Sequence, residues 1–525
     1  MTPQGSAEAP PPPATAVEPE ERENTDIDSS DTRRLHQLGY AQLLHRRMSG
    51  FSNFAVSFSI ISVLTAFTIY GYGLGTGGPV DLTWGYLLVG LFVIVVGLGM
   101  AEICSAYPTS GGLYYWSGRL GGRRGPVWSW FTGWFNVLGQ IAVTAGIDFG
   151  FATFFLAFLS LVAGVQITPE TQLIIYGAAL LVHALLNTFG VRIVAILADV
   201  SAWWHVAGVV LITAVLWIAP AHHASFQYVF LTFKNDTGFR SGIYVFFLGL
   251  LFAQYNFTGY DASAHMTEET HDAANAGPRG IVSSIVISLV AGLILFITVT
   301  FATTDYTGAL TSSTGVPPLQ IFIDALGTRG GELLFIVAFV AAFFCGMCSV
   351  TANSRMIFAF SRDGALPGSR WWSRVNHRTG TPTNAVWLAA VGAFLLGVPY
   401  LWNATAFFAI TSLATIGLYI AYGLPILLRR IHPENFERGP WHLGRWSAPV
   451  GWVAVIWIAF ITVLFCLPET TPITLATFNY APIAVGAVLL FSGGWWVLSA
   501  RKWFKGPHRQ GDETTLEALE EEIAA

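Results

Sequence analysis

An apolar stretch from about residue 242 to residue 264 is interrupted by the polar run Asn256-Phe-Thr-Gly-Tyr-Asp261. The stretch is long enough to cross a bilayer, for which about 20 residues suffice. A polar break at that depth exposes backbone amide and carbonyl groups that lipid cannot satisfy, so it persists only where it lines a cavity. A second break is expected at Ser62-Val-Leu-Thr-Ala-Phe67, near the N-terminus. Two broken helices in matching halves of such a chain are typical of secondary transporters.

The composition places almost the whole chain in a membrane. Of its 525 residues, 53% are hydrophobic and only 11% are charged, whereas about 25% of the residues of a soluble domain are charged. The sequence therefore predicts an all-α polytopic membrane protein with twelve transmembrane helices, since twelve apolar segments each approach the length of a span. These segments are 51–74, 84–105, 126–159, 171–190, 192–219, 241–266, 279–302, 332–361, 384–401, 404–428, 448–467 and 477–498.

The spacing of the spans predicts an inverted repeat. The first five spans begin near residue 51, and the second five begin near residue 241, about 190 residues later. Each block holds an odd number of spans, so the second is inverted relative to the first, and each block opens with a broken helix. We expect a 5+5 repeat made of residues 51–240 and 241–428, followed by two extra spans within residues 429–498.

Both ends of the chain are expected on the cytoplasmic side of the plasma membrane. Residues 1–31 are rich in Pro, Glu, Ala and Ser and are predicted to be disordered. Residues 32–50 suit an interfacial segment, with a short helix over 32–47, and residues 499–525 form the second tail. With the N-terminus inside, all but three of the 26 basic residues, namely Lys234, Arg240 and Arg329, lie on the cytoplasmic side. That distribution is the one that membrane proteins favour.

No cofactor, metal site or nucleic-acid partner is expected. Cys345-Gly-Met-Cys348 has the spacing of a metal or redox motif, but no second ligand pair accompanies it. Residues 73–78 satisfy the glycine pattern of a nucleotide-binding loop, but Pro79 follows and the strand–helix context is lacking. Packing of small residues on one face of a membrane helix accounts for the first segment, and the outer end of the first span with its turn accounts for the second.

Several motifs resemble the amino acid–polyamine–organocation superfamily. They are Phe51-Ser-Asn-Phe54, Tyr70-Gly-Tyr-Gly-Leu-Gly-Thr-Gly-Gly-Pro79, Ala101-Glu-Ile-Cys-Ser-Ala-Tyr-Pro-Thr-Ser-Gly-Gly-Leu-Tyr-Tyr-Trp116, Thr258-Gly-Tyr-Asp261, Glu268-Glu-Thr270 and Arg362-Asp-Gly-Ala-Leu-Pro367. The resemblance covers about residues 36 to 500 and is closest to the amino acid/choline transporter branch. One departure is the first break, which reads Ser62-Val-Leu-Thr65 where many relatives have a Gly-Ser-Gly-like sequence.

The resemblance implies a LeuT-like fold and a permease that moves its substrate by alternating access. The expected substrate is an amino acid, moved in symport with protons or by exchange. Choline, polyamines and γ-aminobutyrate are the alternatives within the family. A transporter-fold amino acid sensor is a further alternative, which concentrative uptake would separate from a carrier.

A zwitterionic substrate needs two opposed polarities at the membrane midplane, and a broken helix supplies both. The outgoing half-helix offers free N–H groups to a carboxylate, and the incoming half offers carbonyl groups to an ammonium. The candidate carboxylate site is the first break, Ser62, Val63, Leu64 and Thr65, and the candidate site for the amine and side chain is the second break, Asn256, Phe257, Thr258, Gly259 and Tyr260.

Other polar residues in the spans are candidates for lining the pathway, coupling or gating. Gln140, Thr144 and Asp148 are spaced four residues apart, so they form one polar stripe on a helix, and the first two are candidates for the substrate site. A buried Asp148 or His205 suits proton coupling, although either could instead form an interhelical hydrogen bond. Asp261 could orient the second break or belong to a gate, and Glu102 lies at the cytoplasmic side, where basic residues could pair with it.

An enzyme that uses Asp199 and His205 as an acid–base pair is disfavoured. The two residues are six positions apart on one expected helix, so they lie about 240° apart around its axis and cannot face one pocket.

Overall fold

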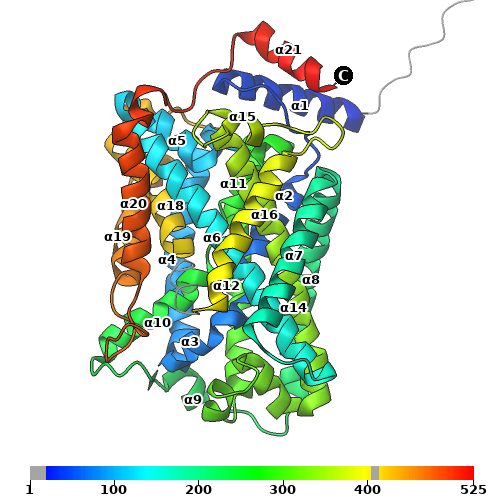
Figure 1. The fold of residues 1–525 in the computed structure, drawn as a ribbon, viewed down its shortest axis with the longest axis vertical. Coiled ribbons are helices and arrows are strands. Elements are labelled where there is room, and N and C mark those ends of the chain that lie inside the picture. Colours follow the sequence, from blue (N-terminus) through cyan, green and yellow to red (C-terminus); the bar gives the residue numbers. More distant parts are fainter. Residues whose placement is uncertain (1–18, 404–412, 525) are drawn as a thin grey trace, which may run out of the picture.

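The computed structural model describes residues 19–403 and 413–524, which form a bundle of long helices (Figure 1). Among these described residues, eleven helices are long and apolar enough to cross a membrane. They are Gly50–Gly75, Asp81–Ala106, Gly122–Ala163, Pro169–Thr188, Val191–Ile218, Ala273–Ala302, Pro317–Arg362, Thr383–Leu401, Leu413–Ile431, Gly444–Phe465 and Ala481–Leu498. The chain is therefore a helical multi-pass membrane protein, as its composition predicted.

Two of the expected spans, the sixth and the tenth, are not seen over their full length as a single described helix. The sixth, residues 241–266, is divided between the shorter apolar helix α10 (Gly242–Asn256) and α11 (Ala262–His265). The tenth, 404–428, begins with residues 404–412, which lie outside the described residues, and continues as α18 (Leu413–Ile431). The total of twelve spans and the inverted LeuT-like repeat stay predictions.

The first long helix is broken where the sequence predicted a break. Helix α2 (Gly50–Ile61) ends at Ser62, whose backbone has φ 29° and ψ 85°. A positive φ is uncommon for a residue other than glycine, and it stops the helical hydrogen-bond pattern. The chain then resumes as a 3₁₀ turn, η1 (Thr65–Ile69), and a short helix, α3 (Tyr70–Gly75).

The second break lies between α10 and α11. Phe257 leaves the helical conformation with ψ 57°, and Gly259 has φ 91°. A Cβ atom on Gly259 would lie 2.2 Å from Cγ2 of Ile60, so only glycine fits both the conformation and the space. The two broken helices thus meet at this glycine.

The remaining long helices surround the two broken ones. They are α4 (Tyr86–Ala106), α6 (Gly125–Ala163), α7 (Pro169–Thr188), α8 (Val191–Ile218), α12 (Ala273–Ala302), α14 (Pro317–Arg362), α16 (Thr383–Gly397), α19 (Ser447–Phe465) and α20 (Ala481–Leu498). Helix α2 packs against α8, α12 and α14, and α6 packs against α14 and α18. The unusual length of α14 includes an interruption at Gly327, where φ is 75° and ψ is 165°.

Short elements close the end of the bundle that carries α3 and α9 (Figure 1). Strand β1 (Thr76–Gly77) follows α3 and pairs antiparallel with β2 (Lys234–Asn235). A π-helical turn, η2 (Asp81–Gly85), leads into α4, while α9 (Phe226–Leu231) and α13 (Tyr306–Leu310) lie in the connecting segments. The other short helices are α5 (Gly112–Leu120), η3 (Gly122–Arg124), η4 (Thr267–Glu269), α15 (Ser369–Trp372), η5 (Val398–Leu401), η6 (Pro433–Asn435), η7 (Gly444–Trp446) and η8 (Ala500–Lys502).

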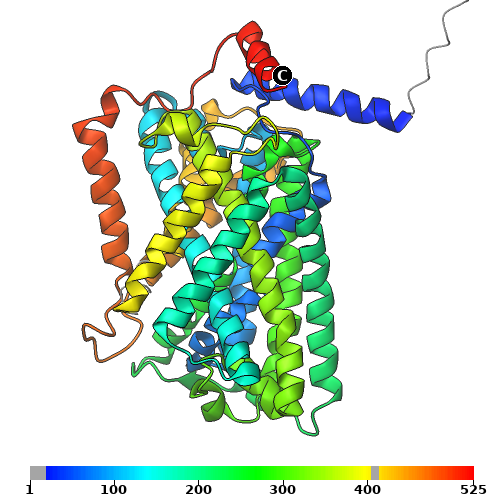
Figure 2. The same ribbon diagram turned by 45° about the vertical axis from the view of Figure 1, so that its right-hand side comes forward.

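The two tails meet at the opposite end, where α1 (Pro19–Leu38) lies next to α21 (Glu513–Ala524) (Figure 2). The His36 ring nitrogen Nε2 lies 2.7 Å from Oε1 of Glu520. Residues 1–18 of the expected disordered tail lie outside the described residues, whereas residues 19–31 belong to α1, contrary to that expectation.

The expected interfacial helix over residues 32–47 is wrong beyond Leu38. Gly39, with φ 103°, ends α1, and the following segment is largely irregular. Tyr40 and Met48 are fully buried, and the backbone N–H groups of Arg47 and Met48 both donate to the carbonyl of Glu269. This segment therefore packs on the end of the bundle, because backbone pairing and burial there outweigh a position on the lipid surface.

Candidate functional site

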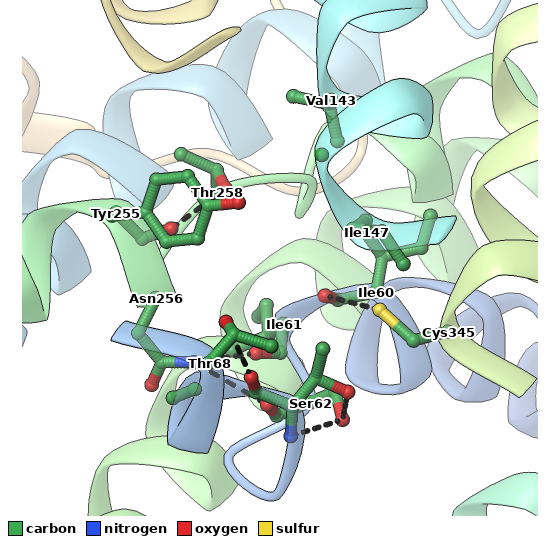
Figure 3. Close-up of a pocket in the computed structure, with 13 residues that line it drawn as sticks. Ile60, Ile61, Ser62, Thr68, Val143, Ile147, Tyr255, Asn256, Thr258 and Cys345 are labelled. Carbon is green, nitrogen blue, oxygen red and sulfur yellow. Dashed lines mark hydrogen bonds between the residues drawn. The ribbon is translucent and has the colours of Figure 1, made fainter. Parts of the chain in front are cut away.

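A cavity lies between the two helix breaks, next to α6 and α14 (Figure 3). The free space that a water-sized sphere can reach there is about 20 Å³, which is about the room of one water molecule. The lining residues are Ile60, Ile61, Ser62, Thr65, Ala66, Thr68, Val143, Gly146, Ile147, Tyr255, Asn256, Thr258 and Cys345. None of these residues carries a charge, so hydroxyl groups, one amide and backbone dipoles supply the polarity of the cavity.

The first break is organised by Ser62. Its hydroxyl group lies 2.6 Å from Oγ1 of Thr65 and 2.7 Å from Nε2 of His205. The other ring nitrogen of His205, Nδ1, lies 2.8 Å from the carbonyl oxygen of Ser201, which can only accept. The neutral ring therefore carries its proton on Nδ1, and Nε2 accepts from the Ser62 hydroxyl.

The turn after Ser62 presents free backbone donors. Among the described residues, the N–H groups of Val63 and Leu64 have no hydrogen-bond partner, whereas those of Thr65 and Ala66 donate to the carbonyl of Ser62. Unpaired N–H groups at the start of a helical turn attract an anion. Val63 and Leu64 are not among the residues that line the cavity, so the carboxylate site expected at the first break stays a prediction.

Asn256 ties the second break to the first. Its side-chain Nδ2 donates to the carbonyl of Ile61 at 2.7 Å (Figure 3), and its Oδ1 accepts from the hydroxyl of Tyr86 at 2.8 Å. Thr258 turns its hydroxyl back onto the carbonyl of Tyr255 at 2.8 Å. The ends of α2 and α10 are therefore held together at the cavity.

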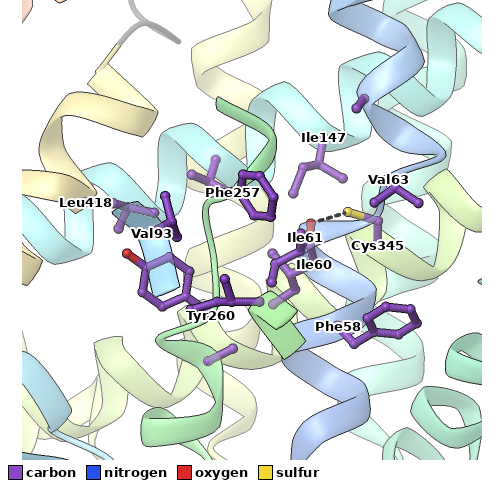
Figure 4. Close-up of a cluster of buried hydrophobic side chains, with 14 of the residues drawn as sticks. Phe58, Ile60, Ile61, Val63, Val93, Ile147, Phe257, Tyr260, Cys345 and Leu418 are labelled. Carbon is purple, nitrogen blue, oxygen red and sulfur yellow. Dashed lines mark hydrogen bonds between the residues drawn. The ribbon is translucent and has the colours of Figure 1, made fainter. Parts of the chain in front are cut away.

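The rest of the second break lies behind the cavity. The carbonyl of Phe257 accepts from the hydroxyl of Tyr419, and the N–H of Gly259 donates to the hydroxyl of Tyr422 at 3.3 Å. Tyr260 is fully buried, and its ring lies 4.9 Å from that of Tyr422. Figure 4 shows Phe257 and Tyr260 in an apolar cluster around the breaks, together with Phe58, Ile60, Ile61, Val63, Val93, Ile147, Cys345 and Leu418.

Asp261 is the centre of a buried polar network and does not line the cavity. Its carboxylate accepts from Nε2 of Gln140 at 2.8 Å and from the hydroxyl of Tyr422 at 2.8 Å. Asn136 and His265 lie 3.3 Å from the same carboxylate. Gln140, expected at the substrate site, thus orients the segment that carries the second break.

Thr144 and Asp148 also have partners away from the cavity. Thr144 shares a hydrogen bond with Ser349 at 2.8 Å. Asp148 Oδ1 lies 2.7 Å from Nδ1 of His183, and both side chains are fully buried. The expected polar stripe therefore packs α6 against α7 and α14, while Val143 and Ile147 of the same helix face the cavity.

Buried ion pairs close the end of the bundle that carries the tails. Arg355 donates to Glu269 through Nε at 2.6 Å and through Nη2 at 3.1 Å. Arg362 also forms a bidentate pair with Glu268, in which Nη1 and Nη2 donate to the carboxylate at 3.0 and 2.9 Å. Glu102 accepts from the hydroxyl of Ser447 and lies 3.4 Å from Arg429, which completes a third pair.

Sequence reasoning missed several of these residues. Arg355, His183 and Cys345 lie within apolar segments. A charged or titratable side chain there indicates an interaction partner, but that partner lies on another helix and cannot be identified from the local sequence. Asp199, by contrast, accepts from Ser52 at 3.2 Å and lies away from His205. The two residues thus have separate surroundings, which removes the acid–base pair considered from the sequence.

A helical membrane bundle with two broken helices around a central uncharged cavity defines a small-solute transporter. A family model described as amino acid permease matches residues 48–489 of this chain. The amino-acid permease BAT1 of Arabidopsis thaliana is 47% identical over 493 residues, which cover 90% of this chain and 95% of the relative. The GABA-specific permease of Saccharomyces cerevisiae is 30% identical over 491 residues, covering 91% of this chain and 86% of the relative.

The chain therefore belongs to the amino acid permease family, within the amino acid–polyamine–organocation superfamily. It is a multi-pass membrane transporter and not an enzyme. The resemblance found in its motifs is confirmed.

Proposed function

We propose that this protein carries an amino acid with a small, uncharged side chain across the plasma membrane, driven by protons. The observation that carries the proposal is the cavity, whose described lining includes no charged side chain. A zwitterion can satisfy both its charges there on backbone dipoles, whereas a polyamine or an arginine side chain would leave a positive charge without a partner. Tyr255 is the one aromatic ring among the lining residues, so an aromatic cage for choline is absent from this part of the structure.

The substrate carboxylate binds the free N–H groups of Val63 and Leu64 and the hydroxyl group of Thr65. The ammonium binds at the carbonyl end of α2, near Ile60 and Ile61, and at the hydroxyl groups of the second break. Ile147 and Val143 line the same cavity and contact the short apolar side chain of the substrate. The substrate thus contacts both broken helices, which is how binding can influence their relative position.

His205 couples this site to protons through Ser62. In the neutral ring, Nε2 accepts from the Ser62 hydroxyl. A proton on Nε2 turns it into a donor, so the Ser62 hydroxyl must turn toward Oγ1 of Thr65, 2.6 Å away. Protonation of one buried ring therefore changes the hydrogen bonds of the turn that holds the carboxylate.

Purified protein in proteoliposomes tests the proposal. Small neutral amino acids should accumulate when an inward proton gradient is imposed, ahead of γ-aminobutyrate, choline, arginine and polyamines. Preference for a cationic substrate would contradict the assignment of the cavity. Substrate binding without any concentrative uptake would favour an amino acid sensor.

The His205→Gln variant tests the coupling. Gln keeps polarity and much of the volume, so exchange of substrate across the membrane should persist while gradient-driven accumulation is lost. The matched control is His377→Gln, because His377 is an exposed histidine far from the cavity in sequence. Full accumulation in the His205→Gln variant would refute the assignment, and loss of both exchange and accumulation would show a structural role.

Cysteine labelling tests the orientation with both termini in the cytoplasm. After replacement of the partly exposed Cys466, single cysteines at the exposed positions Ser225 and Ser313 should react from outside. A cysteine at the exposed Glu437, at the end of the bundle that carries the tails, should react only after permeabilisation. The reverse pattern would invert the topology.

A further inference from the structure

Asp81 is a buried carboxylate without a partner, at the end of the bundle opposite the tails. It begins η2, four residues after the end of β1, and only 1% of its surface is exposed. Neither carboxylate oxygen has a hydrogen-bond partner among the described residues. In this it differs from Glu102, Glu268 and Glu269, each of which is buried beside an arginine.

Two backbone segments lie against this carboxylate. One follows α3 of the first broken helix, and the other is α10 of the second. A Cβ atom on Gly77, just after α3, would lie 1.6 Å from Oδ2 of Asp81, and one on Gly249, in α10, would lie 1.8 Å from it. The same position on Gly249 is 2.5 Å from the carbonyl oxygen of Thr76, which is an acceptor. Backbone therefore covers the carboxylate where a water shell would otherwise be.

The surrounding elements supply no neutralising charge. The titratable groups near Asp81 are Tyr72 of α3, Tyr228 of α9, Lys234 of β2, Asp236 after β2, Tyr244 of α10 and Glu469 in the loop after α19. Helices α4 and α12 have no charged residue at this end of the bundle. Lys234 places its ammonium 4.7 Å from the ring centre of Tyr306, and it forms no ion pair with Asp81.

Two of the nearby hydroxyl groups donate elsewhere, and that of Tyr228 has no hydrogen-bond partner among the described residues, Asp81 included. Tyr72 donates to the carbonyl of Leu248, and Tyr244 donates to the carbonyl of Pro468. An ionised carboxylate in this position would have neither a donor nor a counter-charge, which is a costly state in a water-free environment. A protonated carboxyl group is neutral and avoids that cost.

We propose that Asp81 is a proton-binding site of the outer gate, which is loaded when α3, β1 and α10 pack together and empties when they separate. The carboxylate takes one proton from the outer medium on closing and returns it there on opening, so His205 remains the carrier of the coupled proton. This proposal rests on the proposed proton-linked transport and adds a dependence on outer pH. Because the closed outer end binds the proton more tightly, acidic outer medium favours closure and alkaline medium favours opening.

A metal ion is the competing occupant. A hard cation requires several oxygen ligands, and the described residues include no group of three or more acidic, histidine or cysteine side chains that could hold one. A proton needs only the single carboxylate that is present.

Infrared spectroscopy of the full-length protein in lipid nanodiscs gives a direct test that needs no transport. The wild type should show the carbonyl stretch of a protonated carboxyl group near neutral pH, and Asp81→Asn should lose it. Asp324→Asn is the matched control, since Asp324 is exposed and should leave the signal unchanged. Identical spectra for the wild type and Asp81→Asn would overturn the proposal, as would a wild-type signal that disappears on addition of sodium.

A second variant keeps the test decisive if Asp81→Asn does not fold. Gly249→Ala places a methyl group against Oδ2 of Asp81 and should separate α10 from the carboxylate. The protonated-carboxyl signal should then appear only at lower pH. A signal unchanged in its pH dependence would show that the packing of α10 does not control the proton, and it would overturn the proposal.

Accessibility of the cavity measures the gate itself. A cysteine at Thr68, which lines the cavity, is introduced after Cys345→Ser, and its reaction with a membrane-impermeant reagent is followed from outside. The rate should rise several-fold from acidic to alkaline outer pH and should lose this dependence in Asp81→Asn. A dependence that survives in Asp81→Asn would overturn the role in gating. If these results hold while accumulation ignores the proton gradient, only the proposed coupling fails.

Discussion

The two ends of this transporter are closed by different interactions. At the end that carries the tails, buried carboxylates meet arginines, as in the pair Glu269–Arg355, whose side chains are fully buried. At the opposite end, short backbone strands and glycine contacts cover Asp81, which has no counter-charge. The first kind of closure is electrostatically balanced at any physiological pH, whereas the second changes its charge balance with a single proton.

This difference bears on how the proposed alternating access is controlled. Opening the end with the ion pairs requires separating charges that are buried together, so a compensating interaction must form elsewhere, for example with bound substrate. Opening the other end brings a carboxylate to water, which is favourable once the proton has left. With the orientation proposed above, the two ends are thus suited to different signals, namely substrate at one end and outer pH at the other.

The largest effect should follow from breaking one ion pair. Glu269→Gln leaves the charge of Arg355 buried without its partner and should lower the free energy of unfolding by about 3–5 kcal/mol. Thermal unfolding in nanodiscs measures the loss. The exposed Glu437 provides a matched control, and Glu437→Gln should change stability by less than about 0.5 kcal/mol.

A double variant sharpens this prediction. Replacing both Glu269 and Arg355 with Met removes the charges together and should restore most of the stability lost in Glu269→Gln. If the single and double variants are equally unstable, the pair acts through its shape and not through its charge, and the contrast between the two ends fails.

A somewhat smaller effect is expected at the contact between the two broken helices. Gly259→Ala combines a left-handed φ of 91° with a Cβ atom 2.2 Å from Ile60. Together these should lower the free energy of unfolding by about 2–4 kcal/mol. Substrate affinity, measured by calorimetry, should fall by at least about tenfold. Gly315→Ala is the matched control, because Gly315 has a φ of 67° but no atom within 4 Å of the added Cβ. Equal affinity in both variants would place the second break outside the site.

Glu469 should make the end of the bundle that carries β1 and β2 sensitive to pH. It lies in the loop after α19, where burial raises the pKa of its carboxyl group to about 7, and the hydrogen bond with Tyr72 offsets this only in part. The folded protein therefore holds a proton that the unfolded chain releases above its usual pKa of 4.5. Stability should fall as pH rises from about 4.5 to 7, by on the order of 2 kcal/mol.

The Glu469→Gln variant removes this contribution, so its stability should no longer decline over that range. Unfolding curves at a series of pH values make the comparison. A decline of the same size in Glu469→Gln would assign the pH effect to another group.

The sequence predicted the helix breaks well because their signals are local. A polar run with glycine inside an apolar span, as at Gly259, almost always marks an interrupted helix beside a cavity. The partners of the break residues are long-range and could not be predicted. Gln140 was expected to face the substrate, but it binds Asp261; Arg355 could be placed near one end of its helix, but not opposite Glu269.

Asp81 shows the same limit from the opposite direction. An aspartate at the start of a span has an ordinary solvated interpretation in sequence, and only the approach of Gly77 and Gly249 reveals that it is enclosed. His205 was identified because a titratable ring at depth is rare. Its contact with Ser62, which links it to the first break, depends on the packing of α8 against α2.

The smallest expected effect concerns Lys234 of β2, a cation that contacts an aromatic ring and not a carboxylate. Its ammonium lies 4.7 Å from the ring centre of Tyr306, and such a contact at a partly exposed site is worth about 0.5–1 kcal/mol. Lys234→Met should therefore lower the free energy of unfolding several-fold less than Glu269→Gln does.

A double-mutant cycle isolates this contact. Tyr306 also donates its hydroxyl to Asp236 at 2.6 Å, so Tyr306→Phe removes that hydrogen bond while keeping the ring. The cost of Lys234→Met should persist in the Tyr306→Phe background and vanish in the Tyr306→Leu background. A cost as large as that of the buried pair would mean that Lys234 neutralises a carboxylate of the outer gate. The two ends would then be closed by the same kind of interaction, and Asp81 would need no proton.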